Sequence, residues 1–215
     1  MVLELLASGR DADVFVYAPG RVLRRYRDGG DTTREAAVMT YLADQGFPVP
    51  EVYLADGPDL VMQRVDGPTL LAALTSGEVP MTDGMLLLAD LVNQLHATPG
   101  HVLHMDLHPG NVILGPAGPV VVDWRNFREG DADLDTAMSA LILAWTAFHP
   151  DYRIVPDLRT FLAAVRGRPR DELTLAVEMK RDDPNLTRAE VHRLDAARDF
   201  LLRGFEAVAH ARLGQ

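Results

Sequence analysis

The first third of the chain consists of short apolar runs broken by turn residues, which is typical of strands joined by tight turns. Thr32 and Glu35 then fit a helix capping box, and Gly46 follows the apolar positions of the predicted helix. The pattern predicts three strands, one helix and two further strands. The strands are expected at residues 2–7, 13–17, 21–26, 52–54 and 60–63.

After a linker at residues 65–68, apolar residues recur at helical spacing. A strongly apolar helix at residues 133–148 is expected to end at His149 and Pro150, and Thr187 begins a second capping box with Glu190. Further helices are expected at residues 85–95, 156–165, 171–180 and 187–213. The sequence therefore predicts an α+β fold with two domains, at residues 1–64 and 65–215.

The segment His104-Met105-Asp106-Leu107-His108-Pro109-Gly110-Asn111, followed by Val122-Asp123-Trp124, has the most specific chemistry. It places the carboxylate of Asp106 and the carboxamide of Asn111 on one loop, and Asp123 ends an apolar run that is typical of a buried strand. Magnesium prefers oxygen ligands of this kind, so the spacing predicts magnesium-dependent phosphoryl transfer. Taken alone, Pro-Gly-Asn would also fit an ordinary turn.

Three histidines suggest a different metal. His101, His104 and His108 have the spacing of zinc ligands on a helix, but Pro109 and Gly110 would interrupt that helix. No cysteine is present to complete a zinc site. The phosphoryl-transfer interpretation is therefore preferred.

Composition limits the class of protein. The 215 residues include 21 basic and 31 acidic ones, and a net charge of −10 argues against nucleic-acid binding. The absence of cysteine excludes disulfides. The longest apolar stretch is too short to span a bilayer, and the first residues lack the basic region of a secretory signal. We therefore expect a cytoplasmic protein that binds neither nucleic acid nor a membrane.

Together these motifs resemble the aminoglycoside phosphotransferase and choline kinase-like family, which has a bilobal protein-kinase-like fold. The resemblance covers roughly residues 2–145, and Asp123-Trp124 stands where protein kinases would have Asp-Phe-Gly. It implies a small N-lobe, an antiparallel sheet with one helix, at residues 1–64. It also implies a mainly helical C-lobe at residues 65–215, with ATP and Mg2+ as cofactors.

The resemblance assigns a role to each candidate residue. Asp106 would be the catalytic base or would orient the acceptor hydroxyl, and Asn111 and Asp123 would hold magnesium. The run at residues 60–67 looks like the hinge between the lobes. Adenine would bind to the hinge backbone, and the phosphates to a basic residue with an acidic partner. The residues for these roles are Met62, Gln63 and Val65 at the hinge, Arg24 as the phosphate-binding residue, Glu35 as its partner, and His104 as a brace of the loop.

The chain departs from the family at the phosphate site. Arg24 stands where most kinases have a lysine, and Lys180 is the only lysine among the 21 basic residues. Arginine is bulkier and permanently charged, so the exchange is not neutral. Arg25 would be the phosphate-binding residue if the strand register differed, and Glu35 would also serve as a capping-box glutamate. The expected phosphate loop at residues 8–12 has a single glycine.

We expect an enzyme that transfers a phosphoryl group from ATP to a hydroxyl of a small molecule. An aminoglycoside or another amino-bearing alcohol or sugar is the first acceptor class. The alternative is a catalytically inactive nucleotide-binding or interaction module of the same fold, suggested by Arg24 and a short C-lobe. A protein kinase fits less well, because no Ala-Pro-Glu segment follows Asp123. The sequence leaves the oligomeric state open.

Several acidic residues of the C-lobe have no assigned role from the sequence. Helix capping accounts equally well for three near the start of the helix at residues 133–148, although the family often has an aspartate at the last of them. Others are candidates for the acceptor side. The first group is Asp131, Asp133 and Asp135, and the second is Asp151, Asp157, Glu178, Asp182 and Asp183.

Overall fold

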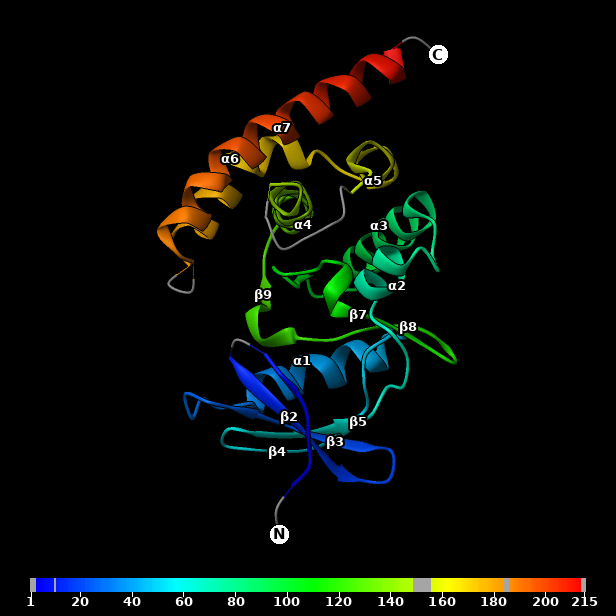
Figure 1. Cartoon of the computed structure of the whole chain (residues 1–215), viewed down its shortest axis with the longest axis vertical. Helices are drawn as coiled ribbons and strands as arrows, with labels where there is room; N and C mark the ends of the chain where they lie inside the picture. The colour runs from blue at the N-terminus through cyan, green and yellow to red at the C-terminus, as the bar shows by residue number, and fades with distance from the viewer. Residues whose placement is uncertain (1–2, 10, 149–155, 184–185, 214–215) are drawn as a thin grey trace. The chain divides into compact units, whose positions relative to one another are not determined.

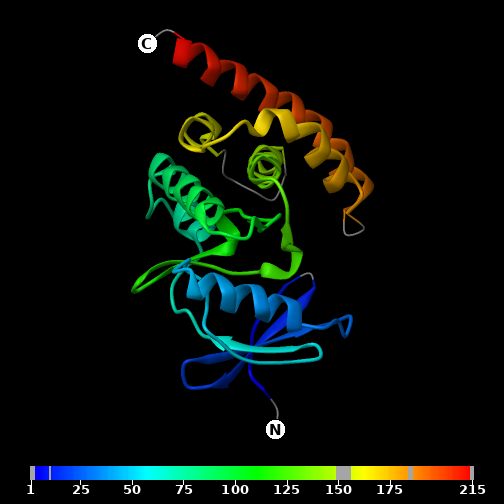
Figure 2. The ribbon, with the colours of Figure 1, turned by 180° about the vertical axis from the view of Figure 1, so that it is seen from behind.

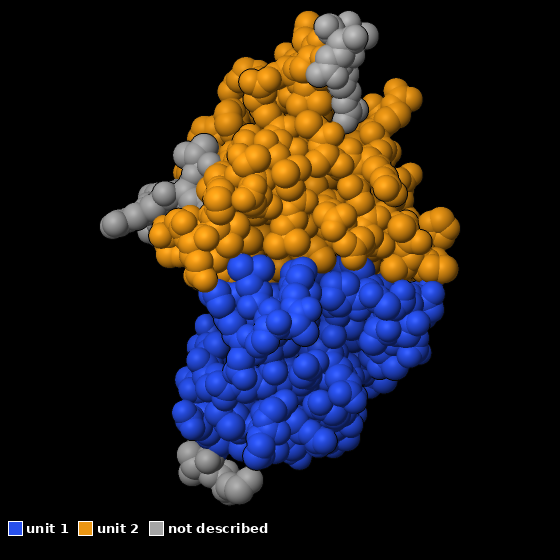
Figure 3. All heavy atoms as spheres, turned by 90° about the vertical axis from the view of Figure 1, so that its right-hand side faces the viewer, with its two compact units in different colours: residues 1–68, 113–127 blue, residues 69–112, 128–215 orange. Residues whose placement is uncertain are grey.

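The computed structural model describes residues 3–9, 11–148, 156–183 and 186–213. Arg10 of the expected phosphate loop, the helix stop at His149-Pro150 and the candidate Asp151 lie outside the described residues. The chain forms two compact units (Figure 3). Unit 1 contains Met1–Pro68 and Ile113–Phe127, and unit 2 contains Thr69–Val112 and Arg128–Gln215.

Unit 1 contains a five-stranded antiparallel sheet with strand order β1-β2-β3-β5-β4 (Figure 1). One helix, α1 at Thr33–Asp44, packs beside it against β4. The predicted order of three strands, helix and two strands is confirmed. The strands are β1 (Leu5–Ser8), β2 (Ala12–Ala18), β3 (Arg21–Tyr26), β4 (Val52–Asp56) and β5 (Asp59–Gln63).

The start of α1 differs from the predicted capping box. The Thr32 side chain accepts no hydrogen bond from the helix. Its hydroxyl donates instead to the carbonyl oxygens of Gly57 and Asp59, at 3.0 and 3.1 Å. Asp31 takes over the capping function by accepting the Thr33 N–H at 2.9 Å. The predicted capping box is therefore wrong: the Thr32 hydroxyl faces the turn at residues 57–59, and the Glu35 carboxylate contacts Arg24, Tyr26 and Trp124 instead.

Residues 113–127 belong to unit 1, although the sequence places them after the start of the helical domain. They carry most of the two-stranded sheet of β7 (Val112–Gly115) and β8 (Gly118–Val121), followed by the short helix η2 (Trp124–Asn126). The Leu114 N–H donates to the Pro68 carbonyl at 2.9 Å, and the Val121 N–H donates to the Pro48 carbonyl at 2.8 Å. The compact units therefore differ in composition from a split at residue 64.

Unit 2 is mainly helical, and its centre is α4 (Ala132–Thr146). Every residue from 135 to 144 of α4 is buried, because α5, α6 and α7 all pack against it (Figures 1 and 2). This burial explains the continuous apolar pattern of the segment. The other helices of unit 2 are α2 (Leu70–Ser76), α3 (Met81–Ala97), η1 (Pro109–Asn111), α5 (Leu158–Ala164), α6 (Pro169–Arg181) and α7 (Arg188–Leu213).

Two helix ends show what the pattern captured and missed. The capping box before α7 is confirmed, since Glu190 accepts the Thr187 N–H at 2.7 Å and donates its own N–H to the Thr187 hydroxyl at 3.3 Å. Helix α2 was not predicted. It begins at a Thr69 cap and ends at Gly77 with φ 77°, two signals that the sequence contains.

Within the described residues, no helix is long and apolar enough to cross a membrane.

Candidate active site

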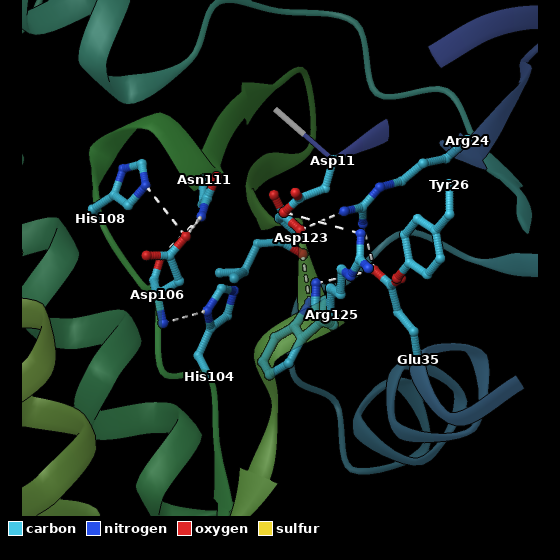
Figure 4. A network of polar contacts seen from close by, with 12 residues as sticks. Asp11, Arg24, Tyr26, Glu35, His104, Asp106, His108, Asn111, Asp123 and Arg125 are labelled. Carbon is cyan, nitrogen blue, oxygen red and sulfur yellow. Dashed lines mark hydrogen bonds and ion pairs between the residues drawn. The ribbon is translucent and has the colours of Figure 1, made fainter. Parts of the chain in front are cut away.

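In unit 2, Asp106 and Asn111 are held on one short loop between β6 (Val102–Leu103) and β7. The Asn111 amide nitrogen donates to the backbone carbonyl of Asp106 at 2.8 Å and lies 3.5 Å from its Oδ2 (Figure 4). This contact turns the Asn111 side-chain oxygen, the atom that a metal would need, away from the loop carbonyl. The Asp106 side chain keeps 23% of its surface exposed, so its carboxylate can be reached by a substrate.

Two histidines hold this loop in shape. His104 is fully buried, and its Nδ1 accepts the backbone N–H of Asp106 at 3.2 Å. His108 caps η1 by accepting the Gly110 N–H at 3.0 Å, and its Nε2 lies 3.8 Å from the Asp106 carboxylate. His104 therefore occupies the bracing position expected for it, and His108 lies next to the carboxylate itself.

The loop is also braced from α4 by Asp135, which is completely buried. Its carboxylate accepts the N–H of His104 at 3.1 Å and the N–H of Met105 at 2.6 Å, and it lies 2.9 Å from Nε2 of the His96 ring. Met105 has φ 65°, a conformation that is costly for a non-glycine residue. Asp135 thus stabilises a strained backbone directly before Asp106.

These partners also determine the ionisation of Asp135. Burial alone would raise the pKa of this carboxyl, but the hydrogen bond and charge of His96 and the Met105 N–H together hold the pKa below its usual value. Asp131, by contrast, is the helix cap, since it accepts the Asp133 N–H at 2.9 Å. The sequence offered capping as an explanation for all three aspartates, and the tertiary contacts separate their roles.

Lys180, in the last turn of α6, also reaches Asp106. Its Nζ lies 3.8 Å from Asp106 Oδ1 and 3.3 Å from Asp183 Oδ2. Its side chain is 22% exposed. The sequence singled out Lys180 only as the single lysine, and nothing in its spacing indicated this neighbour. Of the other acidic candidates, Asp157 caps α5 by accepting the Thr160 N–H at 3.1 Å.

In unit 1, Arg24 lies between two carboxylates (Figure 4). Its Nη1 is 2.5 Å from Glu35 Oε1 and its Nη2 is 2.5 Å from Asp123 Oδ1. Burial would lower the pKa of Arg24, but the charges of Asp123 and Glu35 raise it. Of the two arginines considered from the sequence, Arg24 is therefore the partner of Glu35, because Arg25 points the other way and pairs with Asp59 at 2.5 Å.

The Glu35 carboxylate accepts hydrogen bonds from three donors. Besides Arg24, it accepts the hydroxyl of Tyr26 and the backbone N–H of Trp124, the latter at 3.1 Å. Burial and the charge of Glu35 raise the pKa of Tyr26, which therefore stays protonated. Tyr26 was not singled out from the sequence, although its position two residues after Arg24 places both side chains on one face of β3.

Asp123 stands where β8 leads into η2, with φ 70° and ψ 62°. Its side chain is 41% exposed despite the contact with Arg24. Counted together, Arg24, Glu35 and Asp123 keep one net negative charge. An exposed carboxylate with excess negative charge suits a hard cation, so the residues present are compatible with magnesium.

The predicted hinge follows the end of β5. The N–H groups of Gln63 and Arg64 donate to carbonyl oxygens of unit 1 at 2.8 and 2.9 Å. In the part of the chain that the structure describes, the Val65 N–H makes no such bond. Gly67 has φ 149°, and a Cβ there would collide with the carbonyl oxygen of Leu114. Only glycine therefore fits this position.

Two other predicted features lie on the sheet of unit 1. Met62 is buried in β5 and pairs in register with Val22 of β3. Between β1 and β2, the Gly9 N–H donates to the Ala12 carbonyl at 2.9 Å. The Ser8 hydroxyl donates to Asp13 at 2.7 Å. The described part of the expected phosphate loop therefore lies between β1 and β2.

Comparison with known proteins identifies the family. The model of the phosphotransferase enzyme family (APH) matches residues 2–100 and 81–174. No curated protein matches the chain. Among solved structures, a complex of APH(2")-IIa with streptomycin and ATP is 14% identical, with 84% of this chain and 86% of that chain covered and a TM-score of 0.55.

Two further structures have similar folds. A type VIII aminoglycoside-3'-phosphotransferase is 19% identical, with 95% and 92% of the two chains covered and a TM-score of 0.51. A choline/ethanolamine kinase family protein from Mesorhizobium loti is 16% identical, with 97% and 92% covered and a TM-score of 0.57. These likenesses confirm the predicted α+β protein-kinase-like fold. Because the family model matches most of this chain, the chain belongs to the phosphotransferase enzyme family.

Proposed function

We propose that this protein transfers the γ-phosphoryl group of ATP to a hydroxyl of a small molecule, with Mg2+ as cofactor. The observation that carries the proposal is the braced loop of unit 2, in which the Asp106 side chain is partly exposed while His104, Asp135 and Asn111 hold the backbone of residues 104–106. A carboxylate fixed in this way is suited to orient an acceptor hydroxyl.

In the proposed reaction, Asp106 accepts a hydrogen bond from the acceptor hydroxyl and takes its proton as the new bond to phosphorus forms. The bond between the γ-phosphorus and the bridging oxygen breaks, and ADP leaves. Asn111 and Asp123 would hold magnesium through their side-chain oxygens, and they belong to different units. When bound, magnesium neutralises charge on the phosphate oxygens.

Nucleotide binding would use unit 1. Adenine would bind to the chain after the end of β5 at Gln63, where the Val65 N–H would donate to it. Met62 would pack beside the adenine. Arg24 would bind phosphate with the support of Glu35, because this pair fixes the guanidinium inside the unit.

The acceptor class follows less directly. The named relatives of the fold include proteins for aminoglycosides and for choline or ethanolamine, which supports an alcohol or sugar as acceptor. The amino-bearing acceptor expected from the sequence stays a prediction. We also keep the expectations of a cytoplasmic protein without nucleic-acid or membrane partners as proposals.

An ATP-consumption screen tests the proposal. The wild-type protein would be assayed with Mg2+ and a panel of aminoglycosides, amino alcohols, sugars and polyols, beside Asp106→Asn. Acceptor-dependent ADP release that falls by about 10³-fold or more in the variant supports the enzyme, because orientation and proton transfer both depend on this carboxylate. Binding of Mg-ATP without turnover on any acceptor would favour the inactive module.

A further inference from the structure

The only lysine of the chain lies beside the proposed catalytic carboxylate. Lys180 Nζ is 3.8 Å from Asp106 Oδ1 and 3.3 Å from Asp183 Oδ2, and all three residues belong to unit 2. Every other basic residue of the chain apart from histidine is an arginine. A lysine offers a compact point charge, whereas arginine presents a broad planar fork.

Helix electrostatics do not explain this placement. Cations are favourable at a helix C-terminus, and both Lys180 and Arg181 occupy the last turn of α6. Arg181, however, forms an ion pair with Asp195 at 2.8 Å, and the Arg181 side chain is 44% exposed. Only Lys180 turns to Asp106, so its direction is decided by packing of α6 and not by the helix end.

The position of the ammonium group bears on the acceptor. A hydroxyl hydrogen-bonded to Asp106 lies about 3 Å from the carboxylate, so Lys180 Nζ lies within about 7 Å of the reacting oxygen. An acceptor amine next to that hydroxyl would compete with Lys180 for Asp106 and Asp183 and would be repelled by it. An acceptor oxygen at the same place would instead receive a hydrogen bond from the ammonium.

We propose that Lys180 is a specificity-determining residue, which supplies the cation of the acceptor site and selects an acceptor without an ammonium group beside its reacting hydroxyl. Such acceptors are sugars, polyols and hydroxy acids. This inference rests on the proposed function of Asp106, and it replaces the amino-bearing acceptor class by an oxygen-only one.

Matched acceptor pairs test the proposal in the full chain. Each pair, such as glucose with glucosamine or glycerol with 2-amino-1,3-propanediol, differs by one amine in place of a hydroxyl. We expect the wild-type protein to prefer the oxygen-only member by about ten-fold or more in kcat/KM. Lys180→Met should remove or reverse this preference, because an acceptor ammonium can then occupy the vacated place between the two carboxylates.

Arg181→Met is the matched control, since it removes one positive charge from the adjacent position of the same helix. It should leave the preference within about two-fold of wild type, because a guanidinium exposed to solvent is screened. An amine preference in the wild type, or an acceptor ratio that Lys180→Met leaves unchanged, would overturn the proposal. A purely structural role of Lys180 would lower turnover of both members equally.

A second measurement separates this inference from the proposed function. Reductive methylation with 13C-formaldehyde labels Lys180, the single lysine, together with the N-terminal amine and keeps both charges. The Lys180 NMR signal, assigned by its absence from Lys180→Met, reports acceptor binding directly. With a non-hydrolysable ATP analogue and Mg2+ present, oxygen-only panel members should shift this signal and their amino counterparts should shift it less. If nothing is phosphorylated, the proposed function fails. An unmoved signal with every panel member overturns the role of Lys180.

Discussion

Asp135 accepts the backbone N–H of Met105 at 2.6 Å, one residue before the proposed catalytic carboxylate. The contact joins the buried centre of α4 to the one loop residue whose φ of 65° is unfavourable for its side chain. The geometry of this loop therefore depends on a buried charge thirty residues further along the chain.

Asp135→Asn should destabilise the protein and impair turnover. An amide has one oxygen acceptor for the two backbone donors of His104 and Met105, and its NH2 group would face one of them. We expect a loss of about 2–4 kcal/mol in the free energy of unfolding, measured by urea denaturation. Asp131→Asn is the control, because asparagine also caps helices, and it should cost less than about 0.5 kcal/mol.

The same carboxyl predicts a pH dependence. The pKa of Asp135 is lower in the folded protein than in the unfolded chain, so the unfolded chain binds the proton more readily as pH falls. The stabilisation from Asp135 is complete above the unfolded pKa, about 4, and is lost as pH falls through the folded pKa. The free energies of unfolding of wild type and Asp135→Asn should therefore approach each other as the pH falls below about 4. A difference that widens there would contradict the assignment.

Arg24→Met should be far more damaging than the same change at its neighbour. It leaves the buried carboxylate of Glu35 without its cation, and the expected loss is about 3 kcal/mol in the free energy of unfolding. Arg25→Met removes only the exposed pair with Asp59 and should cost less than about 1 kcal/mol. Equal losses for the two variants, measured by thermal or urea unfolding, would show that the register of β3 differs in solution.

Arg24 should also affect nucleotide binding. Arg24→Lys keeps the charge, but a single ammonium cannot contact Glu35 and Asp123 with the two separate nitrogens seen here. We expect the dissociation constant of Mg-ATP, measured by calorimetry, to rise by about ten-fold, with a smaller loss of stability than in Arg24→Met. Binding that is unchanged would remove Arg24 from the phosphate site.

Gly67→Ala should destabilise unit 1. Its φ of 149° is outside the range of other residues, and the added Cβ meets the backbone carbonyl of Leu114, which cannot rotate away. We expect a loss of about 3 kcal/mol or more by urea denaturation. Gly57→Ala is the control, since its φ is 51° but its Cβ meets nothing within 4 Å, and it should cost only about 1–2 kcal/mol.

The class of fold and the main chemical groups could be predicted from the amino-acid sequence alone. Its apolar periodicity located the five strands of unit 1 and most helices of unit 2, because strands and helices repeat at different spacings. The segment at residues 104–111 predicts Asp106 and Asn111 as site residues, since their proposed roles require a fixed separation on one loop. Helix α2 was missed, although the sequence contains its Thr69 cap and the Gly77 at its end.

Which charged residues contact one another could not be predicted from the sequence and became visible in the folded structure. The Thr32 hydroxyl donates to a carbonyl 25 residues away and does not cap α1. Glu35 accepts hydrogen bonds from three donors, among them the Trp124 N–H. Asp135 binds the backbone of the loop before Asp106 and does not cap α4. Lys180 reached Asp106 across more than seventy residues. Local spacing specifies backbone periodicity and motif geometry, whereas ion pairs between distant segments depend on how whole helices pack, and no short pattern encodes that.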